Sequence, residues 1–436
     1  MAEFECTRRF LVFYSENTFP YPIWRKTYAE FVSAYPHTPI PKSNVLIVCL
    51  MVKSRPDDDS PVTIENFLAP SLEHLRKSAP TRGVSVGDTV APLESRPMDL
   101  SPLEVAFPDG RTVGVGDWLE SAYTDGFVVL HQGQVVYERY FSNQTPATQH
   151  LMFSVGKSFT GALMLMLMEE GRVDATSLVG DLLPELKETA FGDATVQHML
   201  DMTNSINYIE DYANPDSHFT GYLEAMLPGG EGLYSYLKTL TENDDELVHG
   251  EAFHYVTPDP EVLGWIIRRV TGGNLAEALH EMIWAPLGAE HEGYYWLDSH
   301  GVEMAGGGLA ITLRDAARFG QMILQDGRYN GQQVISAEIA RRIKTKRNAE
   351  VFARYYDDEW YYEVADSYHD QWWGYAGVDA VAATGVYGQF IYINSDAGVV
   401  IAKHSSDTDA ESERVDGETA FIMHGISAHL AEQVGR

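Results

Sequence analysis

Two periodic patterns of hydrophobic and polar positions organise the middle of the chain. Residues 126–130 and 134–140 are rich in β-branched and aromatic side chains and flank a short polar turn at residues 131–133. This arrangement predicts a β-hairpin. Residues 158–168 are rich in Ala, Leu and Met and are followed by Gly171. That composition, with a glycine as the stop signal, predicts a buried helix.

Two stretches farther along the chain interrupt this periodicity. Gly306-Gly307-Gly308 precedes Thr312-Leu313-Arg314-Asp315, whose threonine and aspartate are typical of a capped helix start. The glycines are therefore predicted to form a tight strand-to-helix turn. Residues 405–418 are acidic and polar, which predicts an exposed loop before the last helix.

The N-terminal part of the chain differs from the rest. Residues 1–50 show no clear periodicity and contain several prolines, namely Pro20, Pro22, Pro36, Pro39 and Pro41. We expect two units around one active site, preceded by less regular segments: an N-terminal extension at 1–50, an N-terminal arm at 51–115, an α/β subdomain built from 116–160 and 300–436, and a mostly helical subdomain at 161–299.

Charge and hydropathy exclude several classes of partner. The chain carries 63 acidic against 31 basic residues, a formal net charge of −32. Such a surface repels nucleic acid and anionic membranes, and it also suggests adaptation to high salt. The chain is 44% hydrophobic but has no apolar stretch of 18 residues, so a membrane-spanning helix is not expected.

Cysteine usage and the first residues predict the compartment. Cys6 and Cys49 give no disulfide framework. Residues 1–30 are dotted with charged side chains and contain no apolar run of the kind found in signal peptides. We therefore expect a cytoplasmic protein, and its oligomeric state stays open.

The strongest chemical signal is Ser154, three residues before Lys157 at the start of the predicted helix. On a helix this spacing places both side chains on one face, so an amine lies beside a hydroxyl, as an activated nucleophile requires. A helix N-terminus also favours developing negative charge. Ser235 and Lys238 have the same spacing but are not preceded by a predicted hairpin or followed by a predicted buried helix. We therefore expect Ser235 to be an ordinary surface serine.

Other motifs fail when their full patterns are tested. Lys157 and Ser158 resemble the end of a phosphate-binding loop, but Leu151 stands where its first glycine belongs. The nucleophile elbow of α/β-hydrolases likewise lacks its first glycine, because Met152 occupies that position. The histidines do not fall in metal-ligand spacings. We expect no cofactor and no metal.

An ordered series of motifs resembles one superfamily from about residue 110 to the C-terminus. The chain resembles serine hydrolases related to class C β-lactamases and penicillin-binding proteins, and most of all the 6-aminohexanoate-dimer hydrolase group. The matching segments are 127–133, 153–161, 194–203, 255–265, 305–309 and 383–389. The resemblance implies an α+β fold, with an antiparallel sheet flanked by helices and a mostly helical subdomain. It also implies hydrolysis of small linear amides or esters.

The family pattern asks for a catalytic tyrosine, commonly written Tyr-x-Asn, and three tyrosines compete for that role. Tyr212 and Tyr392 are followed by the expected asparagine, whereas Tyr255 is followed by Thr257. We choose Tyr255 because a helix is predicted just after it, at residues 262–267. Tyr392 lies within a predicted strand and is expected in the core. By the resemblance, Tyr212 contacts the substrate amide.

The resemblance also implies an oxyanion hole and a substrate-binding edge strand. The two backbone N–H groups would be those of Ser154 and Val386, with Thr384 and Gly385 beside the substrate. Relatives carry a cation in this strand, but Ala383 replaces it here. Substrates with a carboxylate are therefore disfavoured against uncharged amides or esters.

Three hypotheses of function remain from the sequence. The favoured one is a serine amidase or carboxylesterase that forms an acyl-enzyme on Ser154, with Lys157 and Tyr255 transferring protons. The second is a β-lactamase or D,D-peptidase on the same fold. The third is a catalytically inactive binding or sensor protein, which the intact Ser154, Lys157 and Tyr255 oppose.

Overall fold

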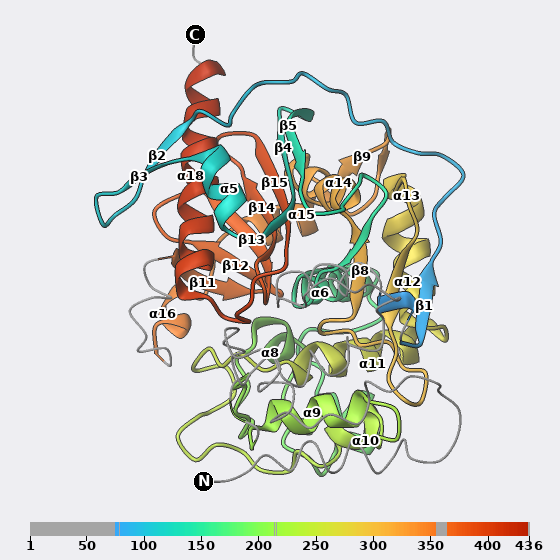
Figure 1. Ribbon diagram of the computed structural model, residues 1–436. Helices are drawn as coiled ribbons and strands as arrows, with labels where there is room; N and C mark the ends of the chain where they lie inside the picture. The colour runs from blue at the N-terminus through green and yellow to red at the C-terminus, as the bar shows by residue number, and fades with distance from the viewer. Residues whose placement is uncertain (1–74, 78, 213, 215, 355–363, 435–436) are drawn as a thin grey trace, which may run out of the picture.

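The computed structural model describes residues 75–77, 79–212, 214, 216–354 and 364–434. At the centre of this described chain lies an antiparallel sheet of seven strands (Figure 1). From edge to edge its strands are β11 (Ala365–His369), β12 (Trp372–Tyr375), β13 (Ala380–Gly385), β14 (Gln389–Asn394), β15 (Val399–Ser405), β4 (Thr124–His131) and β5 (Gln134–Tyr140). Pairing of β15 with β4 joins segments that are far apart in the sequence.

The predicted hairpin is confirmed. Strands β4 and β5 pair antiparallel, with Gly126 opposite Tyr140 and His131 opposite Gln134. Between them Gln132 and Gly133 have φ of 53° and 79°. Positive φ at both central residues is what a two-residue turn of type I′ requires, and such a turn matches the twist of the two strands.

Helices cover both faces of the seven-stranded sheet. Side chains alternate between the faces along a strand, so Phe127 and Val129 pack with α5 (Val115–Ser121) and α18 (Glu413–Val434). Val128 and Leu130 pack on the other side with α6 (Val155–Glu169) and α14 (Leu313–Leu324). The buried helix predicted over residues 158–168 is thus α6, and its end is followed by Gly171 with φ of 70°.

A second sheet lies beside the first. Within the described chain it has four strands in the order β1 (Thr81–Val84), β7 (Gly293–Trp296), β8 (Leu309–Thr312) and β6 (Gln149–Leu151). Two small pairs complete the strands seen: β2 (Glu104–Ala106) with β3 (Thr112–Gly114), and β9 (Arg328–Tyr329) with β10 (Gln332–Gln333).

The prediction that residues 306–308 form a strand-to-helix turn is wrong. These glycines precede strand β8, and the turn into α14 comes at the end of that strand. There Thr312 is the N-cap of α14, and its side chain accepts a hydrogen bond from the Asp315 N–H. The capped helix start is therefore confirmed, but a four-residue strand separates it from the glycines.

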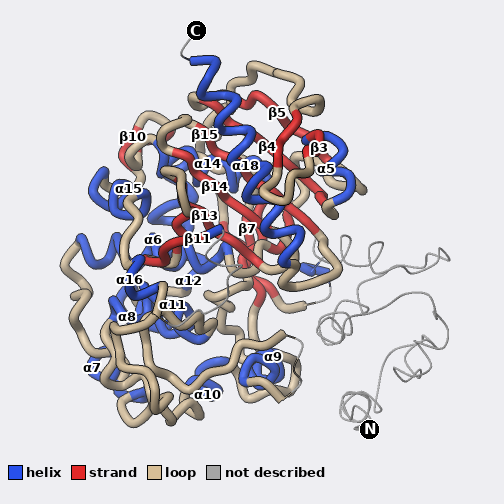
Figure 2. Tube along the Cα trace, turned by 90° about the vertical axis from the view of Figure 1, so that its left-hand side faces the viewer, coloured by secondary structure: helices blue, strands red, loops and turns tan. Residues whose placement is uncertain are grey.

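Helices, most of them short, form the lower part of the molecule, where Figure 2 shows few strands. They are η4 (Pro184–Leu186), α7 (Val179–Leu182), α8 (Val196–Asp201), α9 (His218–Met226), α10 (Leu233–Leu237) and α11 (Pro258–Thr271). Around the sheets lie η3 (Leu75–Lys77), α12 (Leu275–Leu279), the π-helical η5 (His280–Trp284), α13 (Ala285–Leu287), α15 (Ala337–Lys344) and α16 (Ala349–Phe352). None of the described helices combines the length and the apolar run that a bilayer crossing requires.

The expected α+β class is confirmed by this arrangement of antiparallel sheets and helices. The predicted extension at 1–50, and the arm as far as residue 74, lie outside the described residues. The division into two subdomains remains our proposal. Its boundary at residue 160 falls within α6, and the one at 299 falls between β7 and β8.

The prediction that residues 405–418 form an exposed loop is wrong at both ends of that stretch. Ser405, Ser406 and Asp407 are buried, and α18 begins at Glu413. The acidic stretch therefore turns back against the protein after β15 and does not form a free loop.

Candidate active site

Ser154 stands where strand β6 passes into helix α6. Its backbone is anchored on one side by Met152, whose N–H donates to the Leu309 carbonyl over 2.9 Å. Phe153 has φ of 46°, an uncommon conformation for a residue other than glycine, and its ring packs 5.2 Å from that of Tyr387. Strained backbone of this kind clusters at functional sites. The local fold thus holds Ser154 as the N-cap of α6.

Lys157 lies one helical turn on and is directed at Ser154. Its Nζ donates to Ser154 Oγ over 2.8 Å and to the Gly306 carbonyl oxygen over 2.8 Å. The side chain is only 2% exposed. Burial lowers the pKa of the amine to about 8, against the opposing effects of nearby carboxylates. The neutral form of the amine is therefore more accessible near neutral pH than it would be in a solvated lysine.

The second Ser-x-x-Lys motif has a different geometry. Ser235 is half-buried within α10, and Lys238 follows the end of that helix with its side chain exposed. No hydrogen bond between Ser235 and Lys238 is found in the described chain, whereas Lys157 donates to Ser154. The structure thus separates two motifs that are alike in letters.

Tyr255 lies just before α11 and faces the lysine. Lys157 Nζ lies 5.2 Å from the centroid of the Tyr255 ring, and the tyrosine ring also stacks on Trp373. The helix predicted after Tyr255 is confirmed as α11. Tyr392 is fully buried within β14, and its hydroxyl is 2.9 Å from a ring nitrogen of His424, so the expected core position is confirmed.

Glu210 connects the two tyrosine segments, and sequence reasoning did not single it out. One carboxylate oxygen accepts from the Tyr212 hydroxyl over 2.6 Å and from the Thr257 hydroxyl over 2.6 Å. The other accepts from the Thr257 N–H over 2.7 Å. Thr257 occupies the place of the asparagine in the Tyr-x-Asn pattern. The bond from the Thr257 hydroxyl to Glu210 gives that substitution a structural function in this chain.

The end of strand β13 lies against Ser154. The expectation of an edge strand is wrong, because β13 is paired on both sides, with β12 and with β14. A Cβ built on Gly385 would come within 3.1 Å of the Ser154 nitrogen and would also collide with the Met152 carbonyl oxygen. Only a residue without a side chain permits this approach. Val386 follows directly in the chain and lines the same pocket as Ser154.

A pocket of about 130 Å³ opens over Ser154. Its lining brings together six of the seven residues selected from the sequence: Ser154, Tyr212, Tyr255, Thr384, Gly385 and Val386. Lys157, the seventh, is buried and bound to Ser154 from within the protein. In the part of the chain that the structure describes, no cluster of His, Cys, Asp or Glu is arranged to hold a metal ion.

A family model of β-lactamases matches residues 114–422. The chain belongs to the β-lactamase family. Within this family, the 6-aminohexanoate-dimer hydrolase of Paenarthrobacter ureafaciens is 31% identical over 369 residues, which are 83% of this chain and 91% of that protein. The chain is accordingly a serine hydrolase.

Solved structures of the β-lactamase family agree with this membership. A Bacillus anthracis protein assigned as a 6-aminohexanoate-dimer hydrolase matches with a TM-score of 0.75 at 32% identity, covering 87% of this chain and 99% of the other. A penicillin-binding protein homologue from Caulobacter crescentus matches with a TM-score of 0.54 at 17% identity, covering 73% and 96% of the two chains. The second match shows the fold alone.

Carboxylates are the unexpected feature of this β-lactamase-family pocket. Glu210, Glu411 and Asp416 line it, and its described lining contains no Lys, Arg or His. Desolvation and the neighbouring Glu210 and Asp211 raise the pKa of Glu411 to about 7. Burial raises the pKa of Asp416 as well. Ala383, at the position where the resemblance implies a cation, is 1% exposed in the apolar core.

Proposed function

We propose that the chain hydrolyses small amides or esters through an acyl-enzyme on Ser154, with Lys157 and Tyr255 as the proton-transfer groups. The observation that carries this proposal is the 2.8 Å hydrogen bond between a buried lysine and a serine on the floor of a pocket. A neutral amine at this distance can take the serine proton as the hydroxyl attacks a carbonyl carbon.

The reaction has two halves. In the first, Ser154 Oγ bonds to the substrate carbonyl carbon, and its proton passes through Lys157 and Tyr255 to the leaving amine or alcohol. In the second, water attacks the acyl-enzyme, gives up a proton to the same pair and releases the acid, while Ser154 regains its hydrogen. The lysine amine and the tyrosine ring lie close together. The protonation of one therefore changes the pKa of the other, and the two groups titrate as a coupled pair.

The oxyanion of each tetrahedral intermediate would bind to the backbone N–H groups of Ser154 and Val386. Support comes from Gly385, whose close packing on the Ser154 nitrogen brings the end of β13 to the N-terminus of α6. A helix N-terminus adds a favourable field for the negative charge. Thr384 and Gly385 would then lie beside the substrate backbone.

Tyr212 would recognise the amide of a substrate and would not carry protons. Its hydroxyl hydrogen is donated to Glu210 over 2.6 Å, which leaves the hydroxyl oxygen free to accept from a substrate N–H. Desolvation and the neighbouring Glu210 raise the pKa of Tyr212 well above its ordinary value. A tyrosine with such a raised pKa stays protonated, so the phenolate that could accept a proton is not formed.

The charge of the pocket favours substrates without a carboxylate over β-lactams and peptidoglycan stems. The described residues of the lining include the acidic side chains of Glu210, Glu411 and Asp416 and no Lys, Arg or His, so a substrate carboxylate would find no cationic partner there. A β-lactamase or D,D-peptidase activity is the alternative. It has the family membership in its favour but no cationic group in the described lining of the pocket.

A hydrolysis panel tests this proposal. It compares short-chain nitrophenyl esters, linear amide dimers, a chromogenic cephalosporin and D-alanyl peptides, each with the protein and with Ser154→Ala. We expect turnover of the esters or amide dimers that Ser154→Ala abolishes. Faster turnover of the cephalosporin or D-alanyl peptide would favour the alternative, and no turnover anywhere would favour a binding protein.

A further inference from the structure

Lys157 has a second partner whose position is set elsewhere in the molecule. Its amine donates to the Gly306 carbonyl over 2.8 Å, as closely as it approaches Ser154. Gly306 belongs to the segment between β7 and β8, at residues 303–308, which passes α6 and α11. From α6, the Thr160 hydroxyl donates to the Ala305 carbonyl over 3.1 Å. The direction of the lysine amine therefore depends on where this segment lies.

Glu261 binds that segment from the first turn of α11. Its side chain is 1% exposed, and its two carboxylate oxygens accept from the N–H groups of Ala305 over 2.9 Å and Gly306 over 2.8 Å. The Tyr222 hydroxyl adds a third hydrogen bond over 2.7 Å. Burial raises the pKa of Glu261, and these three donors oppose the rise. A position in the first turn of a helix further favours the carboxylate.

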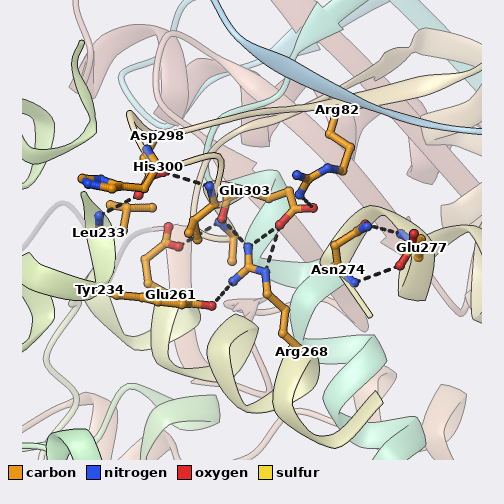
Figure 3. Close-up of polar contacts among 12 residues, drawn as sticks. Arg82, Leu233, Tyr234, Glu261, Arg268, Asn274, Glu277, Asp298, His300 and Glu303 are labelled. Atoms are coloured by element: carbon orange, nitrogen blue, oxygen red, sulfur yellow. Dashed lines mark hydrogen bonds and ion pairs between the residues drawn. The ribbon is translucent and has the colours of Figure 1, made fainter. Parts of the chain in front are cut away.

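A second attachment holds the start of the same segment. Figure 3 shows Glu261 and Arg268 directed from α11 toward the backbone around Glu303. Arg268 donates to the Glu303 carboxylate over 2.9 Å through Nε and to its carbonyl oxygen over 2.9 Å through Nη2. Arg82 pairs with the other carboxylate oxygen. Since seven residues make about two helical turns, Glu261 and Arg268 lie on one face of α11.

We propose that Glu261 is a positioning residue for the Ser154–Lys157 pair: its carboxylate fixes the backbone at residues 305 and 306 so that the Gly306 carbonyl holds one N–H of the lysine amine. With that N–H engaged, the lone pair of the neutral amine is directed toward the Ser154 hydroxyl. The inference rests on the function proposed above, and it adds a residue that touches neither substrate nor nucleophile.

Glu261 also acts on the lysine through its charge. The titratable groups that face Lys157 are Glu210 from the loop before α9, Asp259 and Glu261 from α11, and the Tyr255 ring. Each of the three carboxylates raises the pKa of the lysine, while burial lowers it further than they raise it. Replacing Glu261 by a neutral residue should therefore move the lysine titration to lower pH. A residue that only stabilised the fold would not produce this shift.

The experiment measures the second-order rate of Ser154 labelling by a fluorophosphonate between pH 5 and 10, which requires no knowledge of the natural substrate. Glu261→Gln should lower the plateau rate at least about tenfold and move the rising limb to lower pH. In the wild-type protein two backbone N–H groups donate to the two carboxylate oxygens of Glu261. In Glu261→Gln one of these N–H groups would face the amide nitrogen, which is itself a donor, so that hydrogen bond would be lost. Melting temperatures confirm that the variant is folded.

Two companion variants separate position from charge. Tyr222→Phe keeps the carboxylate and both backbone donors, so its limb should stay at the wild-type pH. Glu261→Asp keeps the charge but is one methylene shorter, so its plateau should fall while its limb stays in place; it also replaces Glu261→Gln if that variant does not fold. A folded Glu261→Gln or Glu261→Asp with the wild-type rate and limb would overturn the inference.

The same assay keeps this failure distinct from failure of the proposed function. If Lys157→Ala is labelled at the wild-type rate, the proposed mechanism itself is contradicted. If Lys157→Ala labels slowly while the Glu261 variants keep the wild-type labelling rate and pH profile, the proposed mechanism is supported. Only the positioning role of Glu261 is then contradicted.

Discussion

The Lys157 amine donates to the Ser154 hydroxyl over 2.8 Å while its side chain is 2% exposed. Closeness and burial matter together. A lysine this close in water would remain charged and would not accept a proton, whereas burial alone would leave the serine without a base. Lys238, three residues after Ser235, has an exposed side chain beyond the end of its helix.

A fluorophosphonate should label Ser154 and not Ser235. Of the two serines, Ser154 alone combines a buried amine with a helix N-terminus and the adjacent end of strand β13. Mass spectrometry of the labelled peptide is the measurement. We expect Ser154→Ala to abolish labelling and Ser235→Ala to leave it unchanged. Label that persists in Ser154→Ala would show that the nucleophile has been misassigned.

Activity should rise with pH along a limb near pH 8. Burial lowers the pKa of Lys157 to about 8, opposed by Glu210, Glu261 and Asp259, and the Tyr255 ring also faces the amine. The amine is protonated below this pKa and cannot take the serine proton, so the rate falls as the pH drops. The measurement is kcat/KM against pH, which reports groups of the free enzyme.

Variants assign this limb to the lysine. Lys157→Ala should reduce kcat/KM by about 10²- to 10⁴-fold, as loss of a general base does, and should remove the limb. Lys238→Ala is the matched control and should keep both rate and limb. Because the pKa of Glu411 is also raised, to about 7, Glu411→Gln must be measured too. A limb that disappears in Glu411→Gln would move the assignment to that carboxyl.

Gly385→Ala should impair the oxyanion site. The added methyl group would collide with the Met152 carbonyl and come within 3.1 Å of the Ser154 nitrogen, so β13 must move away from α6. We expect a loss of at least about 10²-fold in kcat, the size seen when one oxyanion donor is removed. Gly114→Ala is the control, since a Cβ there meets only ordinary contacts at 3.7 Å or more. Equal activity of both variants would argue against this oxyanion site.

Local spacing predicted the contact between Ser154 and Lys157 because its geometry is local. A separation of three residues on a helix brings two side chains together whatever the rest of the fold does, and α6 indeed brings Lys157 to Ser154. The hairpin at residues 131–133 and the cap at Thr312 were predictable for the same reason. The ordered motifs then supplied Tyr255 and the end of β13.

No local spacing or motif in the sequence indicated the carboxylates of the site. Glu210 gains its function from Tyr212 and from Thr257, which is 47 residues away. Glu411 and Asp416 belong to an acidic stretch whose composition is typical of a solvated loop. They reach the pocket because the chain turns back after β15, a tertiary event that composition does not encode. Charge in a folded site depends on neighbours that are distant in sequence.

The last prediction separates the two tyrosines by what each hydroxyl does. Tyr255 faces the lysine and is proposed to move protons, so Tyr255→Phe should lower kcat by at least about a hundredfold for esters and amides alike. Tyr212 donates to Glu210 and holds its proton, so its hydroxyl is proposed only to bind the substrate amide.

Tyr212→Phe should therefore weaken amide cleavage while nitrophenyl esters react nearly as before. Such a selective loss indicates a transition-state contact made to one substrate class. The measurement is kcat/KM for a linear amide dimer and a nitrophenyl ester with both variants, after checking that each is folded. The opposite pattern, with both activities lost in Tyr212→Phe and neither in Tyr255→Phe, would make the literal Tyr-Ala-Asn motif catalytic, because only a group that moves protons is needed for every substrate.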